Sequence, residues 1–294
     1  MIYDTLCLSS GGVYGLAYIG ALDYLVDENI IYLDKINNYV GTSIGSLILF
    51  FIVIGYNIKE INEIIINLNF SKLQSEINIE NVLLNNGIND GSKFIILLKF
   101  FLKKKLNKND ITFNELYLKL NKNFTVIGTN YSKGEEAIFN YIKTPDMSII
   151  TAIRISISVP IIFTPVLYKD EYYIDGALTN TFPINHCNQE TTIALNLPYS
   201  NSYKIDNIID ILMNSIKIMS KSISCKNEFQ ISDNIINIYN EEFNSFDLNV
   251  SLETKIKLIS IGRDAIIEHV NKSKKLINLL CTNIINDIIN HITF

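Results

Sequence analysis

One serine between two glycines is the first stretch of the sequence that suggests chemistry. The pentapeptide from Gly41 to Gly45 reads GTSIG and stands between a short β-forming run and a dense apolar stretch. Where a strand turns sharply into a helix, flanking glycines remove collisions and the central side chain is exposed. The helix amino terminus adds unpaired N–H groups where an oxyanion would form. The pattern predicts that Ser43 is a nucleophile; the alternative is an ordinary glycine-flanked turn.

A serine hydroxyl needs a base to become a nucleophile, and the sequence offers few. His186 lies in a polar, loop-like stretch, and His269 and His291 lie in helix-patterned sequence, so surface or structural roles are the simpler interpretation. Asp175 follows an alternating strand pattern and precedes a glycine, which places its carboxylate at a sharp turn or makes it a simple turn former. We favour Asp175 as the base, although Ser43, Asp175 and His186 also satisfy the order of a histidine-dependent hydrolase.

A glycine-rich segment, SGGVYG from Ser10 to Gly15, lies between the first predicted strand and the first predicted helix. Adjacent glycines there can present several backbone N–H groups to a negative oxygen. A nucleotide-phosphate loop is the rival interpretation, but neither GxGxxG nor GxxxxGK[ST] occurs in this segment. We therefore interpret it as an oxyanion loop.

The elements that must position these residues alternate between strand and helix. Residues 3–8 and 36–40 have strand patterns, and helical patterns follow them over residues 16–26 and 44–54. Two successive strand-turn-helix units predict a mainly parallel sheet covered by helices. The other predicted elements are strands over 124–129, 136–141, 193–197 and 234–239, a hairpin over 166–174 that turns near Lys169 and Asp170, and a helix over 148–156.

Helical patterns dominate two further segments. Residues 57–121 are the natural position of a helical cap, and within them an apolar run over 94–101 leads into Lys103, Lys104 and Lys105. This run is typical of a helix at a membrane interface, or of a core-facing helix with a basic C-terminal end. Residues 199–294 form a mostly helical extension, whose last helix has Ile277, Leu280, Ile284 and Ile288 on one face. Since no repeat or linker is visible, we predict one domain over 1–294 with its core motifs in 3–198.

Composition excludes several classes of protein. Of 294 residues 48% are hydrophobic, which is enough for a large core, and the net charge of −5 argues against nucleic-acid binding. Neither a zinc site nor a disulfide framework is suggested, and no acidic calcium loop is present, so we expect no metal and no other cofactor. The N-terminus lacks a signal-peptide pattern and no apolar run reaches the roughly 20 residues of a membrane span, which predicts a cytoplasmic protein. The scattered cysteines are Cys7, Cys187, Cys225 and Cys281, expected to be free thiols.

Three elements in one order, SGGVYG, GTSIG and DGA, resemble the patatin-like phospholipases. The stretches TFNELYLKL, VIGTNY, SISVPIIFTPV and YIDGALTNTFPI extend the similarity, which covers residues 3–198. The resemblance implies a three-layer α/β/α fold with a mainly parallel central sheet and a helical cap. It also implies hydrolysis of fatty-acyl esters of phospholipids or lysophospholipids, with peripheral contact to membranes. The resemblance to some secreted bacterial members leaves open whether a partner protein must activate the enzyme.

The resemblance assigns roles to individual residues. Ser43 corresponds to the nucleophile and Asp175 to the acid of a Ser-Asp dyad that activates it directly, so no histidine is required. The oxyanion hole corresponds to Gly11, Gly12 and Val13, and the supporting glycines of the motifs are Gly15, Gly41, Gly45 and Gly176.

Two departures from the family pattern bear on function. The family loop reads Gly-Gly-Gly-x-Arg/Lys-Gly, whereas Ser10 replaces its first glycine and Tyr14 its basic residue. Loss of that charge predicts weaker oxyanion stabilisation, and therefore reduced activity or altered substrate choice. Two other functions fit the sequence: a histidine-dependent esterase or thioesterase for a soluble acyl substrate, and a lipid-binding module of the same fold that has lost turnover.

Overall fold

The computed structural model describes residues 3–73, 86–198, 205, 208–226, 233–239 and 248–292; within these ranges the side chains of 208–210, 212–213, 223–226 and 276–292 are not described. In this part of the chain an eight-stranded sheet has the order β10-β9-β1-β2-β4-β8-β7, with β5 also paired to β4. Strands β10, β9, β1, β2 and β4 are parallel, while β5 and β8 run antiparallel to β4. The strands are β1 Thr5–Leu8, β2 Asn38–Thr42, β4 Asn123–Asn130, β5 Glu135–Phe139, β7 Val166–Tyr168, β8 Glu171–Asp175, β9 Thr192–Asn196 and β10 Ile235–Asn237.

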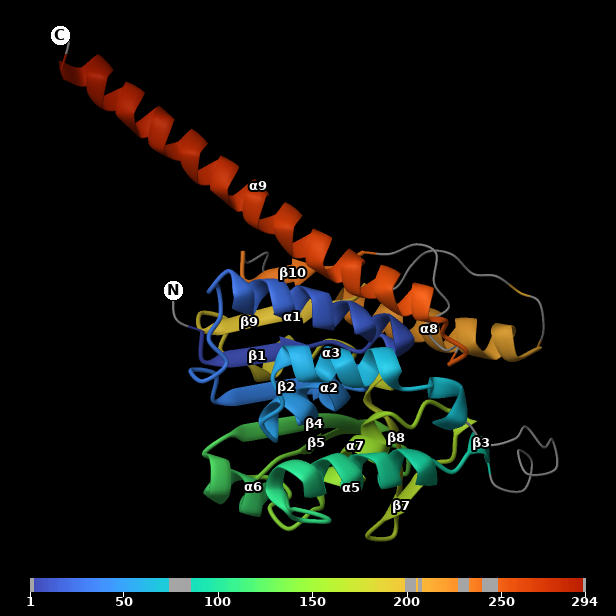
Figure 1. Cartoon of the computed structure of the whole chain (residues 1–294). Helices are drawn as coiled ribbons and strands as arrows, with labels where there is room; N and C mark the ends of the chain where they lie inside the picture. Colours follow the sequence, from blue (N-terminus) through green and yellow to red (C-terminus); the bar gives the residue numbers. More distant parts are fainter. Residues whose placement is uncertain are drawn as a thin grey trace.

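Helices follow the strands as the two predicted strand-turn-helix units require. In Figure 1, α9 and α1 lie beside the β10–β1 side of the sheet, and α5 and α6 lie beside its β8–β7 side. The helices are α1 Ala17–Asp27, α2 Ile44–Val53, α3 Ile58–Asn67, α5 Ser92–Leu106, α6 Phe113–Leu120, α7 Ile149–Ser156, α8 Ile208–Lys226 and α9 Leu252–Ile292. Short 3-10 helices are η1 Gly12–Leu16, η2 Phe70–Leu73, η3 Gly176–Leu178 and η4 Pro183–His186. The α/β fold with a mainly parallel sheet is confirmed.

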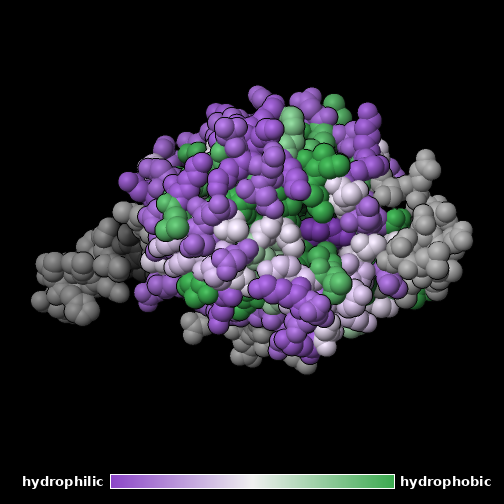
Figure 2. Space-filling model, turned by 90° about the horizontal axis from the view of Figure 1, so that it is seen from below, coloured by the Kyte–Doolittle hydropathy of each residue, from purple (hydrophilic) through white to green (hydrophobic). Residues whose placement is uncertain are grey.

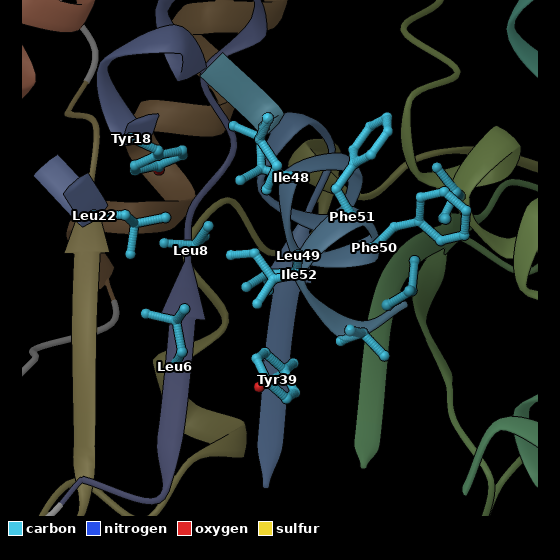
Figure 3. Close-up of a cluster of buried hydrophobic side chains, with 14 of the residues drawn as sticks. Leu6, Leu8, Tyr18, Leu22, Tyr39, Ile48, Leu49, Phe50, Phe51 and Ile52 are labelled. Carbon is cyan, nitrogen blue, oxygen red and sulfur yellow. The ribbon is translucent and has the colours of Figure 1, made fainter. Parts of the chain in front are cut away.

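The main hydrophobic core lies between the sheet and helices α1 and α2. Side chains alternate along β1, so Leu6 and Leu8 face this core while Cys7 faces a smaller cluster on the opposite side. Figure 3 shows Leu6 and Leu8 beside Leu22 of α1, with the apolar side chains of α2 next to them. Because α2 is buried around most of its circumference, it forms a rigid support directly behind Ser43.

The C-terminal helix α9 packs against α1 at an unusually close crossing. A Cβ on Gly262 would lie 1.7 Å from the Ala17 carbonyl oxygen, and one on Gly20 would lie 1.8 Å from that of Ile259. Both positions must therefore be glycine, and Arg263 strengthens the crossing through a 3.0 Å ion pair with Asp23. The predicted helix is present and extends far past α1 (Figure 1), but the side chains expected to share its apolar face, from Ile277 to Ile288, lie outside the described residues.

Helix α5 combines both interpretations of the apolar run before the three lysines. Phe94 and Phe101 are buried, so the helix is core-facing. Its opposite face leaves Ile96 66% and Phe100 51% exposed. A small second sheet, in which β3 (Gly87–Asn89) pairs with β6 (Ile161–Phe163), was not predicted, because strands of three residues are too short to show a period.

Candidate active site

Ser43 occupies the sharp turn between β2 and α2. Its φ of 53° and ψ of −123° form a backbone conformation that non-glycine residues rarely adopt. The flanking glycines are required by space: a Cβ on Gly45 would lie 2.5 Å from the Leu8 carbonyl oxygen, and one on Gly41 would lie 2.7 Å from the Ser46 nitrogen. The turn therefore has the strained, tightly packed form that the GTSIG sequence predicts.

The structure brings Ser43 and Asp175 together across 132 positions of sequence. Strand β8 ends at Asp175, which lies opposite Gly128 on β4, and β4 in turn neighbours β2. Ser43 Oγ donates a 2.7 Å hydrogen bond to Asp175 Oδ2, while the Ala177 N–H donates to Oδ1 at 2.8 Å. Both carboxylate oxygens are thus oriented, one by the hydroxyl and one by the backbone after the strand.

Burial governs the acidity of this carboxylate. Asp175 is only 1% exposed, and burial raises its pKa to about 7, although the hydrogen bonds from Ala177 and Ser43 act in the opposite direction. An acid with a pKa near neutrality can accept a proton from a hydroxyl and return it. The pair therefore has the geometry and the acidity that proton transfer between the Ser43 hydroxyl and Asp175 would require.

The glycine-rich loop approaches Ser43 from β1. Gly12 has a φ of 55°, which favours glycine, and it begins η1, so the N–H groups of Gly12 and Val13 have no intrahelical acceptor. Gly12, Val13 and Ser43 line the same pocket. Gly15 lets η1 rest on α2, because a Cβ there would lie 2.3 Å from Ile44 Cγ1. This arrangement offers backbone donors beside the serine, as expected for an oxyanion loop.

Gly11, Gly176 and Ser10 make close contacts with neighbouring segments. A Cβ on Gly11 would lie 2.5 Å from Leu197 Cδ1, and one on Gly176 would lie 2.4 Å from the Ile127 carbonyl oxygen. Ser10, which replaces the first family glycine, donates its backbone N–H to the Thr181 carbonyl at 2.8 Å. These contacts hold both loops against the ends of the strands.

The hydroxyl of Tyr14 has a hydrogen-bond partner other than Ser43. Its ring is buried, and its hydroxyl donates to the Ile238 carbonyl at 3.1 Å, next to β10. Strands β9, β1, β2 and β4 separate β10 from the strand that carries Asp175. Because burial raises the pKa of Tyr14, the side chain stays neutral and does not replace the charge of the family's basic residue.

An apolar pocket of about 110 Å³ opens beside Ser43. Its walls come from η1, α2, η2, the start of α5, the loop after α7, β6 and the segment before α9, and none of the described residues that line it is charged. Most of these residues were not predicted, because the sequence around Phe70 and Leu248 has no pattern that indicates proximity to Ser43. The lining residues are Gly12, Val13, Leu16, Ser43, Ile44, Leu47, Phe70, Phe94, Ile157, Val159, Ile162, Phe163 and Leu248.

The described histidines have partners other than Ser43. His186 Nε2 lies 2.8 Å from Glu136 Oε1, and His269 Nε2 lies 2.9 Å from the Asp233 carbonyl oxygen. The side chain of His291 lies outside the described residues. The geometry thus favours Asp175 over His186 as the base.

Within the described ranges the chain has neither a cluster of metal ligands nor a membrane-spanning helix. No three His, Cys, Asp or Glu side chains gather there as ligands for a metal ion. No helix in those ranges is both long enough and apolar enough to span a bilayer.

The fold and the glycine-supported serine define the class of protein. The sequence matches the family model described as patatin-like phospholipase over residues 6–187. The chain therefore belongs to the patatin-like phospholipase family, and the resemblance seen in the sequence is confirmed.

Two viral proteins are similar to this chain in sequence. The protein named "Probable lipid hydrolase 463L" of Invertebrate iridescent virus 6 is 36% identical over 188 residues, which are 62% of either chain. "Uncharacterized protein R571" of Acanthamoeba polyphaga mimivirus is 29% identical over 286 residues, 91% of this chain and 93% of that one. The match to the first relative thus spans less than two thirds of its length.

Two bacterial proteins share the fold. VipD from Legionella pneumophila superposes with a TM-score of 0.65 at 18% identity, covering 92% of this chain and 67% of that one. The type III effector ExoU superposes with a TM-score of 0.51 at 16% identity, covering 92% of this chain and 53% of that one. At these identities the likeness concerns the architecture alone.

Proposed function

We propose that this protein is a lipid acyl hydrolase of the phospholipase A or lysophospholipase type, in which Ser43 and Asp175 form a catalytic dyad. One observation carries the proposal: the 2.7 Å hydrogen bond from the hydroxyl of Ser43, in its strained turn, to the buried carboxylate. Membership of the family supports the broader activity, lipid hydrolysis, and the dyad is the proposed mechanism for it.

The proposed reaction has two steps, acylation of Ser43 and deacylation by water. Ser43 Oγ bonds to the acyl carbonyl carbon while its proton moves to Asp175, and the oxyanion is held by the N–H groups of Gly11, Gly12 and Val13. The ester C–O bond then breaks, and the alcohol leaves with the proton from Asp175. Water adds to the acyl carbon and gives a proton to Asp175, which returns it to Ser43 Oγ as the fatty acid departs.

The apolar pocket is the proposed site of the acyl chain. Since none of the described residues in its lining is charged, it would desolvate a phosphate at high cost, so the head group stays outside. Its volume of about 110 Å³ is somewhat below the roughly 150 Å³ of a cavity that binds benzene, so it holds the few acyl carbons nearest the ester. Phe70, Phe94 and Phe163 provide the aromatic part of this wall.

The exposed face of α5 is the proposed contact with a membrane. Ile96 and Phe100 project from it beside the exposed lysines Lys103 and Lys104, and Lys104 Nζ lies 4.7 Å from the centre of the Phe100 ring. Apolar side chains flanked by lysines suit an anionic bilayer surface. Figure 2 shows that hydrophobic residues on the side that carries α5 form separate groups among hydrophilic ones, which suits a peripheral contact. A cytoplasmic location, one domain over the whole chain, and independence of metals and other cofactors belong to the same proposal.

Active-site labelling together with a lipid panel tests the proposal. A fluorophosphonate should label the native chain, and mass spectrometry of mixed phospholipids and lysophospholipids should show released fatty acid. Ser43→Ala should abolish both signals, and Asp175→Asn should reduce both by at least about a hundredfold. His186→Ala is the matched control and should retain activity.

Two results would replace the proposal. Loss of activity in His186→Ala with retention in Asp175→Asn would establish a histidine-dependent esterase. Lipid binding without labelling of Ser43 and without turnover would establish a non-enzymatic module.

A further inference from the structure

The last turn of α7 and the loop that follows it hold the backbones of both proposed dyad residues. The Ser43 N–H donates to Ser156 Oγ at 2.8 Å, and the Asp175 N–H donates to the Ser158 carbonyl at 2.9 Å. Ser156 and Ser158 are two positions apart and both are fully buried. A single short segment therefore sets the position of the serine relative to the carboxylate.

The direction of each hydrogen bond at Ser156 is fixed. Its hydroxyl has one proton, which it donates to the Ile127 carbonyl of β4 at 2.6 Å. The oxygen is then free to accept only, and its donor is the N–H of Ser43. The hydroxyl thus connects the strained turn to the strand that also pairs with β8.

The carbonyl side of Ser43 has more than one donor. Ser46 Oγ donates to the Ser43 carbonyl at 2.7 Å, and the Leu47 N–H donates to the same oxygen at 3.1 Å. Loss of the Ser46 hydroxyl would leave that carbonyl satisfied, whereas loss of the Ser156 hydroxyl would leave the Ser43 N–H buried without its acceptor. The two serines are equally buried and contact the same residue, so they form a matched pair.

The segment itself is anchored by a buried arginine. Arg154, 3% exposed, donates from its guanidinium to Ser158 Oγ and, at 3.0 Å, to the Thr164 carbonyl. It also donates to the Asp90 carbonyl at 2.9 Å, next to the start of α5. These bonds tie the loop after α7, which lines the pocket, to a second element of the fold.

We propose that Ser156 is a positioning residue for catalysis, whose hydroxyl holds the N–H of Ser43 and so keeps the strained serine aligned with Asp175. The inference rests on the proposed function, since it requires Ser43 to be the nucleophile. It also assigns the oxyanion to other donors: the Ser43 N–H is already bonded to Ser156, so the N–H groups of the glycine-rich loop must serve. Displacement of a reacting atom by about 1 Å costs up to about a hundredfold in rate.

The test compares Ser156→Ala with Ser46→Ala on a soluble ester. Ser156→Ala should lower kcat by about 10- to 100-fold and leave KM within about twofold, because the pocket is untouched. Ser46→Ala should lower kcat by less than about threefold, although each variant loses one buried hydroxyl. Melting temperatures of both variants would separate the effect on the reaction from a general loss of stability.

Rates of fluorophosphonate labelling at Ser43 distinguish this inference from the proposed function. If the native chain is not labelled at Ser43, the proposed function fails. If the native chain is labelled and Ser156→Ala reacts at the same rate, or if both serine variants lose activity equally, only the positioning role is refuted. Should Ser156→Ala not fold, Ser156→Cys decides in its place, since its side chain still occupies the site and is a weaker acceptor.

Discussion

Replacing Asp175 with asparagine should stabilise the protein at neutral and alkaline pH while it removes the proposed activity. The carboxylate is buried, and among the described residues its hydrogen-bond donors are the Ala177 N–H and the Ser43 hydroxyl, neither of which carries a positive charge. Burial raises its pKa from 3.8 in the unfolded reference to about 7. The folded protein therefore tolerates the ionised form poorly, and asparagine removes that penalty.

The magnitude follows from the linkage between proton binding and folding. At low pH the carboxyl group is protonated in both states, and the full stability is present. As the pH rises past 3.8 the unfolded chain releases its proton, while the folded chain keeps it until about 7, so stability is lost over this window. The two pKa values differ by about three, and at about 1.4 kcal/mol for each tenfold change in proton affinity this corresponds to roughly 4 kcal/mol.

The measured quantity is the difference in unfolding free energy between Asp175→Asn and the native chain at several pH values. It should grow by roughly 4 kcal/mol between about pH 4 and about pH 8, whatever its value at the acid end. Urea unfolding followed by far-ultraviolet circular dichroism suits a chain with no Trp. Asp146→Asn, at an exposed aspartate, controls for the loss of one negative charge. A difference that stays constant within about 1 kcal/mol across this range would refute the raised pKa and the reasoning that follows from it.

Two further predictions concern catalysis and membranes. If Asp175 must be ionised to accept a proton, kcat/KM should rise with pH to a plateau above about 7 and fall about tenfold for each pH unit below it, which a pH–rate profile checks. A rate that does not change between about pH 5 and about pH 8 would contradict this role. Phe100→Ser should weaken binding to anionic liposomes several-fold with little loss of stability, whereas Phe101→Ser should mainly lower the melting temperature, because Phe101 is buried and Phe100 is half exposed. Equal liposome binding by native and Phe100→Ser chains would remove α5 from the proposed membrane contact.

Local sequence patterns predicted the parts of the fold and site that depend on nearby residues. The turn around Ser43 and the turn after β8 both depend on glycines within a few positions, so the local sequence is enough to predict their geometry. Two apolar phenylalanines of α5 look alike in the sequence, however, and only packing decides that Phe101 is buried while Phe100 is exposed. Isolated glycines such as Gly20 and Gly262 likewise gave no sign of the α1–α9 crossing, which needs both helices at once.

Ser156 was missed for a related reason. It lies within SISVPIIFTPV, which contributes to the family resemblance, yet a buried serine at the end of a helix has no local feature that indicates a partner 113 positions away. Its importance follows from a backbone donor, and backbone donors are present at every residue except proline. Functional residues that act through the backbone of others are therefore the hardest to find in a single sequence.

The pocket beside Ser43 depends on residues outside the segment that defines the family. The family match ends at residue 187, but Leu248 lines the pocket directly. Lys255 of α9 acts on it indirectly: its ammonium group donates to the carbonyls of Ile65 and Leu68 at the end of α3, at 2.9 and 2.6 Å, and lies 4.7 Å from the ring centre of Phe70. A lysine at a helix C-terminus satisfies carbonyls that the helix leaves unpaired, so this contact fixes the start of η2 and the Phe70 ring that lines the pocket. The proposed acyl site is thus completed by the C-terminal third, which supports one domain over the whole chain and explains why motifs alone do not define the substrate.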